Sequence, residues 1–325
     1  MDLTHCLHTH IDLSPQLMAI LLKDRTTDRN IFWATDSYSH LGAGYQFFDE
    51  ITLDAIDGPN GNVIIPRALK PRQLQQKRSK KMAEVFTPSW VCNNMNNLVD
   101  NAWFGREDVF SSEIIGSDNK RSWANTQGKI EFPEGKAWTD YVSENRLEIT
   151  CGEAPFLVSR YDTVTGEFLP VERRIGLLDR KLRIARENTS TPAEWLKAAK
   201  SALRSTYGYE WQGDNIVIAR GNMLFTMMEH YQYVFQSSLP EDVVLECAEI
   251  ISWNIWQMDG LKMVIPCSCH DEEISASLFG DSAETKPCPG CKKKDYWLHN
   301  GIYAKIMDWE AGRPTQFVSI LKKNK

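Results

Sequence analysis

Several features that would assign a protein to a class at once are absent from this sequence. No apolar run approaches the roughly 18 residues that a membrane-spanning helix needs. The N-terminal segment MDLTHCLHTHIDL lacks the basic stretch of a signal peptide, and the chain shows no internal repeat and no low-complexity tract. We therefore expect a soluble, cytoplasmic protein with no membrane partner.

Positive charge is also scarce. The formal net charge is −6, which argues against a general nucleic-acid coat because phosphate binding needs local positive charge. One basic run, RALKPRQLQQKRSKK, lies between residues 67 and 81. It is either the positive surface of a nucleic-acid groove or a solvated helix or linker.

What is present is the composition of a folded protein. The 325 residues are 42% hydrophobic and 25% charged, which suits one large domain with appendages. Strands are expected at 146–150, 174–178, 261–265 and just before Gly213. Helices are expected from Thr87, from Thr191 to about 205, and from 239 to about 258. Strand and helix alternate, so an α/β fold with a mostly parallel sheet is predicted.

The predicted domain organisation has four parts. An N-terminal region spans 1–80, an α/β domain 81–266, and a metal-binding insertion 267–298. A C-terminal hairpin at 299–325 is expected to complete the sheet as an antiparallel edge. The polar stretch from 105 to 140 is expected to be an irregular excursion.

Four cysteines cluster near the C-terminus in two close pairs. In a chain without an export signal, paired cysteines suggest metal before disulfide. CPGC is a tight knuckle that directs two sulfurs to one ion, and four thiolates form a closed structural zinc site, as in zinc ribbons. His270 or His299 can replace one sulfur, and the alternative is a set of free reduced thiols. The predicted ligands are Cys267, Cys269, Cys288 and Cys291.

Polar residues also follow each predicted strand. The segment EITCGEAPFL begins with an acid, Glu148, and turns at Cys151-Gly152, where backbone can approach a ligand closely. Asp179 closes the second predicted strand, a position that binds ribose hydroxyls in nucleotide-binding sheets. Asp214 follows the third and can reach an adenine amine. Each of these also has a simpler explanation: the loop EITCGEAPFL can be a packing turn, Asp179 a surface acid, and Asp214 part of an ordinary turn.

Taken in order, these motifs resemble the DNA adenine methyltransferases, and in particular short proteins called restriction endonuclease subunit M. The family's cofactor loop commonly reads DPACGSGAFL, and EITCGEAPFL aligns with it without gaps. The family also has a Thr-Pro helix start upstream, where Phe86-Thr87-Pro88 stands here. The resemblance covers about 80 to 265 and implies a Rossmann-like class I methyltransferase sheet. It implies S-adenosylmethionine contacts at Thr87, Pro88, Glu148, Cys151, Gly152, Phe156, Asp179 and Asp214.

The catalytic motif departs from the family. The family has Asn or Asp, then Pro-Pro and an aromatic residue, which bind and stack on a flipped base. This chain has no Pro-Pro, and its nearest equivalent is Asn254 with Trp256 in ISWNIWQMDG. Those residues also fit a buried helical face.

Two functions follow from the resemblance. The first is an S-adenosylmethionine-dependent methyltransferase acting on the adenine amino group of DNA, with a degenerate catalytic motif, in a restriction-modification or phage-defence system. The second is an inactive homologue that binds nucleic acid or a partner subunit. Under either, a second protein subunit is expected to supply target recognition. A third interpretation is a zinc-ribbon binding protein whose α/β match is chance.

Overall fold

The computed structural model describes residues 13–82, 84–85, 87–273 and 285–321. The helices are α2 Pro15–Leu22, α3 Leu53–Ile56, α4 Arg72–Met82, α5 Ser89–Phe104, α6 Trp138–Ser143, α7 Leu177–Asn188, α8 Pro192–Arg204, α9 Gly213–Phe235, α10 Glu241–Asn254 and α11 Pro289–Lys293. The strands are β1 Ser111–Ile115, β2 Arg121–Asn125, β3 Arg146–Glu148, β4 Thr206–Glu210, β5 Ile255–Gln257, β6 Glu272–Glu273, β7 Thr285–Lys286, β8 Lys305–Asp308 and β9 Arg313–Gln316.

The centre of the fold is a small parallel sheet with strand order β3-β4-β5. Helices α7 and α8 connect β3 to β4, and α9 and α10 connect β4 to β5. The mixed α/β class with a mostly parallel sheet is therefore as predicted. Parallel strands need such crossovers, because the chain must return to the same end of the sheet before the next strand begins.

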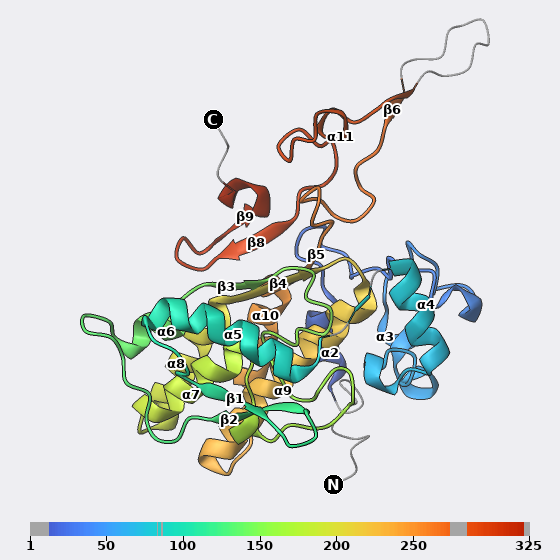
Figure 1. Ribbon diagram of the computed structural model, residues 1–325. Helices are drawn as coiled ribbons and strands as arrows, with labels where there is room; N and C mark the ends of the chain where they lie inside the picture. Colours follow the sequence, from blue (N-terminus) through green and yellow to red (C-terminus); the bar gives the residue numbers. More distant parts are fainter. Residues whose placement is uncertain (1–12, 83, 86, 274–284, 322–325) are drawn as a thin grey trace, which may run out of the picture.

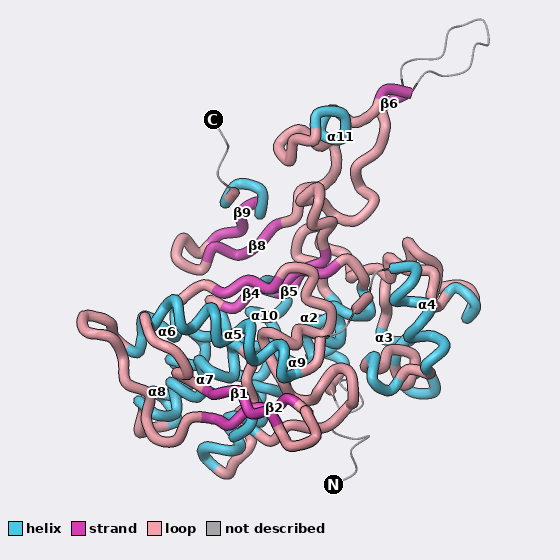
Figure 2. Tube along the Cα trace, viewed as in Figure 1, coloured by secondary structure: helices cyan, strands magenta, loops and turns pink. Residues whose placement is uncertain are grey.

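The two faces of this sheet have different neighbours, because successive side chains of a strand point to opposite sides. Ile255 joins the main hydrophobic core, which the helices build. Tyr209 and Trp256 point the other way and pack with Ile306 and Phe317 of the C-terminal segment. Helices, sheet and C-terminal hairpin thus form successive layers (Figure 2).

The C-terminal hairpin does not complete the central sheet as predicted. Strands β8 and β9 pair with each other, antiparallel, in a separate two-stranded sheet. The reason lies in the packing: the ring of Phe317 lies 5.1 Å from that of Trp256 and 6.0 Å from that of Tyr209. The hairpin and the turn that follows it therefore cover one face of the sheet, with Phe317 packed against two aromatic side chains of the sheet, and do not extend the edge strands.

The second predicted strand, at 174–178, is also wrong. The segment around Ser159 places a hydroxyl that accepts hydrogen bonds from the Ile175 and Gly176 N–H groups, and α7 begins at Leu177. A Cβ on Gly176 would lie 2.4 Å from the Leu157 carbonyl oxygen. The chain therefore turns directly into a helix beside the loop that follows β3.

Two predicted helix starts have different outcomes. Helix α8 begins with the predicted capping box, in which Thr191 accepts the Glu194 N–H and the Glu194 carboxylate accepts the Thr191 N–H. Helix α5 begins one residue later than predicted. Pro88 is its N-cap, with no side-chain cap bond, and Thr87 lies outside the helix. Phe86 lies outside the described residues.

The N-terminal region packs against the α/β domain. Helix α2 is capped by Ser14 and buries Leu17, Leu21 and Leu22 in the same core as α9 and α10. The polar stretch predicted to be irregular contains the antiparallel hairpin β1-β2. The segment that carries the paired cysteines extends away from the body near β6 and α11 (Figure 1). No helix among the described residues is both long and apolar enough to cross a membrane.

Candidate metal centre and cofactor cavity

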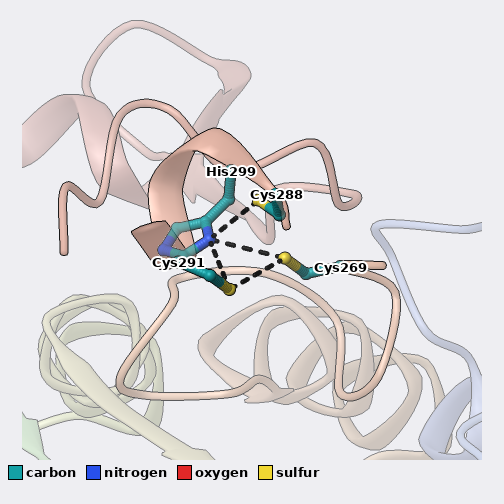
Figure 3. A group of neighbouring side chains, drawn as sticks. All are labelled: Cys269, Cys288, Cys291 and His299. Carbon is teal, nitrogen blue, oxygen red and sulfur yellow. Dashed lines mark hydrogen bonds between the residues drawn. The ribbon is translucent and has the colours of Figure 1, made fainter. Parts of the chain in front are cut away.

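Three cysteines and one histidine converge in the C-terminal extension. Cys269, Cys288, Cys291 and His299 each offer one ligand atom, and these atoms lie within 4.8 Å of one another (Figure 3). The Nδ1 atom of His299 lies 3.5 Å from Cys269 Sγ, 3.6 Å from Cys288 Sγ and 3.8 Å from Cys291 Sγ. Ligand bonds of about 2.0–2.3 Å in a tetrahedron give edges of about 3.3–3.8 Å. The group can therefore hold a metal ion such as zinc.

Local chain geometry explains why the CPGC knuckle and His299 meet. Pro289 begins the short helix α11, with Cys288 as its N-cap and Cys291 within the helix. A Cβ on Gly290 would lie 2.6 Å from both the backbone nitrogen and the ring of His299. Only glycine at this position lets the histidine approach the knuckle.

The fourth ligand differs from the prediction. Cys267 is exposed and lies outside the group, and His299 takes its place. His270, the other histidine considered, is exposed and its Nδ1 contacts the Ser268 carbonyl at 3.2 Å. Cys267 lies within the turn that precedes Cys269 and has a left-handed backbone conformation, with φ of 60°. The C-x-C pair therefore supplies one ligand instead of two.

A large cavity lies at the carboxyl ends of β3 and β4. Its volume is about 830 Å³, which is within the range of small-molecule sites. Open parallel sheets generally bind ligands at this end of their strands. Helix α5 and the segment before it form another wall. The lining residues include Glu84, Val85, Thr87, Met95, Asn96, Leu147, Glu148, Cys151, Gly152, Phe156, Leu177, Glu210, Trp211, Gln212 and Asn215.

Two glutamates shape the loop EITCGEAPFL against this cavity. Glu148 accepts the Leu157 N–H at 3.2 Å, and Glu210 at the end of β4 accepts the Gly152 N–H at 3.0 Å. Thr150, Gly152 and Ala154 all have left-handed φ angles of 47°, 53° and 64°. The loop is therefore folded tightly by carboxylates that cap its N–H groups.

The charge of these glutamates depends on their surroundings. Burial raises the pKa of Glu148 well above its ordinary value, against the opposing effect of the Phe156 and Leu157 N–H groups. Burial likewise raises the pKa of Glu210, against the Gly152 and Gln212 N–H groups. A cation in the cavity would favour the ionised form of both carboxyls.

Most of the predicted cofactor residues reach this cavity. Thr87, Glu148, Cys151, Gly152 and Phe156 line it, whereas Pro88 does not.

Asp179 and Asp214 are engaged elsewhere. Asp179 lies in the first turn of α7 instead of at a strand end, where it accepts the Ser159 N–H at 2.9 Å and contacts His230. Asp214 lies in the first turn of α9, fully buried, with Lys70 at 3.2 Å and Arg78 at 2.9 Å. Neither lines the large cavity, so the ribose and adenine contacts predicted for them have no support in the structure.

Asn254 and Trp256, the predicted catalytic pair, are both buried in packing contacts. The Asn254 amide donates to two backbone carbonyls at the end of α8 and to the Thr206 carbonyl at the start of β4, at 2.9 to 3.1 Å. Its oxygen accepts the Trp309 indole N–H. Trp256 is 1% exposed beneath the hairpin. The helical-face alternative fits Asn254, which ends α10, while Trp256 lies on β5.

Sequence reasoning missed the residues at the end of β4 and directly after it. Glu210, Trp211 and Gln212 line the cavity, and Asn215 in the first turn of α9 joins them. The Asn215 amide is 1% exposed, and neither its oxygen nor its nitrogen has a hydrogen-bond partner among the described residues. The signal in the sequence is the glycine in EWQG, directly after a strand. Gly213 packs closely on Phe32, and a Cβ on Gly213 would lie 2.1 Å from the Phe32 carbonyl oxygen.

Comparison with protein-family models, with curated proteins and with solved structures found no match.

Proposed function

We propose that the large cavity binds S-adenosylmethionine and that the protein is a methyltransferase of the DNA adenine type with a diverged catalytic motif. The observation that carries this proposal is the cavity itself, at the carboxyl ends of two parallel strands and beside a loop that resembles the cofactor loop of that family. Glu148 and Glu210 offer carboxylates to the positively charged sulfonium and ammonium groups of the cofactor.

The polar end of the cavity suits a base. Arg78 donates hydrogen bonds to Glu84 and Gln212 and forms an ion pair with Asp214. Asn215 follows Asp214 in the chain, so all of these side chains lie near one another. The Oε1 atom of Glu84 and both amide atoms of Asn215 have no protein partner within the described part of the chain. A buried carboxamide matches the paired donor and acceptor of an adenine edge. Trp211, half-buried at the cavity wall, offers a ring for stacking.

Helix α4 offers a contact for DNA. Its exposed residues Arg72, Lys77 and Lys80 are basic, and the chain enters the cavity wall at Glu84 just after the helix. Exposed cations beside a base-binding cavity place positive charge where the phosphate backbone would pass.

Calorimetry with S-adenosylmethionine tests the cofactor. We expect Glu148→Gln to weaken binding at least about tenfold, or about 1.4 kcal/mol, because the variant removes a negative charge facing a cation. Glu134→Gln, at an exposed position outside the cavity, should bind as the parent does. No binding to the parent at millimolar cofactor would refute the proposal.

Labelled methyl transfer to DNA then separates the two functions. The placement of Asn254 and Trp256 in the packing favours the second function, an inactive homologue that binds nucleic acid or a partner subunit. Cofactor binding with no transfer to diverse DNA would support that homologue. Transfer that Trp211→Ala abolishes, with cofactor binding retained, would support catalysis at the end of β4.

We further propose that the cysteine-histidine group holds one structural zinc ion. Four protein ligands leave no open position for substrate or water. Metal analysis should give one zinc per chain in the parent and in Cys267→Ser, and a loss of zinc in Cys269→Ser. Equal zinc content in the two variants would contradict this ligand set.

A further inference from the structure

A second, smaller cavity lies on the other side of the segment Ile175 to Leu177. Its volume is about 230 Å³, and it shares no lining residue with the large cavity. Helix α7, helix α9 and the loop after β2 enclose it. Four arginines line it, together with acids, one histidine and one tyrosine: Arg174, Arg180, Arg183, Arg186, Asp179, Glu172, Glu187, His230 and Tyr233.

The buried acids of this cavity are saturated by protein donors. Asp179 accepts the N–H and the hydroxyl of Ser159 on one oxygen, at 2.9 and 3.2 Å, and contacts His230 at 3.0 Å with the other. Glu187 accepts Arg183 Nε at 2.7 Å and the Ile130 N–H at 2.8 Å. The side chain of Glu172 is exposed at the rim. These carboxylates therefore have few free acceptor positions.

The donors, in contrast, are not all used. Arg174 and Arg180 are 5% and 2% exposed, yet Arg174 Nη1 and Arg180 Nε have no hydrogen-bond partner among the described residues. Arg186 lies over the ring of Tyr233, at 5.1 Å, and forms no ion pair with any residue that the structure describes. Arg174 pairs with Glu229 and Arg180 with Asp100, both at 2.6 Å, so each guanidinium keeps one nitrogen without an acceptor. A buried N–H without an acceptor is unfavourable, so this cavity is suited to a ligand that supplies oxygen acceptors.

His230 adds one free hydrogen-bond acceptor to the cavity. The Ser159 hydroxyl accepts hydrogen bonds from the Ile175 and Gly176 N–H groups, so its own hydrogen is donated to Asp179. Asp179 is thus an acceptor, and His230 donates to it through Nε2–H. Burial lowers the pKa of His230, against the effect of Asp179. In the neutral ring, Nδ1 is an acceptor, and it has no partner in the described chain.

We propose that this second cavity binds a phosphate group, with Arg174, Arg180 and Arg186 donating to its oxygens. A monohydrogen phosphate or a protonated phosphomonoester also has a P–OH group that can donate a hydrogen bond to His230 Nδ1, whereas a phosphodiester has none. The shared chemistry is a tetrahedral oxyanion, and its source is either a free mononucleotide or the backbone of a nucleic acid. Arginine is the side chain best suited to such oxygens because its planar group donates through several N–H bonds.

Phosphate titration followed by calorimetry tests the site on the full-length protein. The parent should bind inorganic phosphate, and Arg186→Gln should weaken that binding at least about tenfold. Arg186 has no ion pair to lose among the described residues, so this variant should fold normally, as circular dichroism can check. Arg204→Gln, at an exposed arginine of α8 outside the cavity, is the matched control and should bind as the parent does.

Competition then identifies the source. Displacement of phosphate by a mononucleotide, but not by a short DNA duplex, would indicate a free nucleotide ligand, and the reverse would indicate a nucleic-acid backbone. The proposal is wrong if the parent does not bind phosphate at millimolar concentration, or if Arg186→Gln and Arg204→Gln weaken binding equally. The S-adenosylmethionine titration uses the other cavity, so its result does not depend on this one.

Discussion

Asp214→Asn tests whether the buried ion pairs around the first turn of α9 hold helix α4 and its flanks on the body. Asp214 is fully buried and its side chain contacts Lys70, Arg78 and the Tyr38 hydroxyl, the last at 2.7 Å. Asparagine keeps the shape and an acceptor oxygen but removes the charge. Both cations are themselves buried, so the substitution leaves Lys70 without a carboxylate within ion-pair distance in the described structure.

The size of the effect follows from this burial. Removing one partner of a buried ion pair typically costs about 3–5 kcal/mol, because the remaining charge stays away from water without compensation. Arg78 keeps its contact with Glu84, so we expect the lower part of that range. The free energy of unfolding of Asp214→Asn should therefore fall by about 3 kcal/mol at pH 7.

Urea unfolding, followed by fluorescence, measures this change. Asp118→Asn is the matched control, because Asp118 pairs with Lys120 at 2.8 Å with both side chains largely exposed. Exposed pairs contribute little, so the control should unfold close to the parent midpoint. The reasoning fails if Asp214→Asn unfolds at the same urea concentration as Asp118→Asn.

The pH dependence provides an independent check. Burial alone would raise the pKa of Asp214, but Arg78 and Lys70 outweigh it and hold the pKa well below its ordinary value. A carboxyl with a depressed folded-state pKa stabilises the protein above its unfolded pKa of about 4, and that contribution is lost as the pH falls further. The stability difference between parent and Asp214→Asn should therefore narrow below about pH 4.

Three further predictions follow. Gly290→Ala should lose zinc, as metal analysis would show, because its Cβ overlaps His299; full zinc content would contradict the close approach of His299 to the knuckle. Burial raises the pKa of Glu153 to about 7. The free energy of unfolding should therefore fall as the pH rises from about 4.5 to 7, and it should fall less steeply in Glu153→Gln. Equal slopes for the two proteins would contradict this prediction. Asn254→Ala should destabilise the fold by about 2–3 kcal/mol in urea unfolding, since it unpairs buried carbonyls, and should leave cofactor affinity unchanged; unchanged stability would contradict this prediction.

The elements that were predictable from sequence are those fixed by local chemistry. The capping box at Thr191 and Glu194 involves residues three apart, and helix α8 begins there as predicted. The strand ending at Glu148 is followed by the predicted turn, and five of the expected cofactor residues line the cavity. Three of the four cysteines in the two predicted pairs belong to a group that can hold a metal ion.

The errors came from tertiary contacts that the local sequence pattern does not reveal. The segment before Asp179 is apolar enough for a strand, but Ser159 holds its N–H groups and starts a helix. His299 replaces Cys267 because Gly290 admits the imidazole, a fit that spacing alone does not reveal. Asp214 follows a strand as predicted, but its carboxylate contacts Lys70 and Arg78 and does not line the cavity. These two cations lie more than a hundred residues earlier in the chain.

The departures of EITCGEAPFL from the family loop acquire a physical meaning in this structure. Ala154 stands where the family has its second glycine, and its φ of 64° is the conformation that glycine adopts most easily. Glu153 stands where the family has serine, and its carboxylate accepts the Arg67 N–H and the Tyr161 hydroxyl. The loop therefore adopts a glycine-like turn at Ala154, and the Glu153 carboxylate links it to the segment preceding α4. Because that segment also carries Lys70, the same N-terminal residues support the loop and the first turn of α9, so the cavity depends on both halves of the chain.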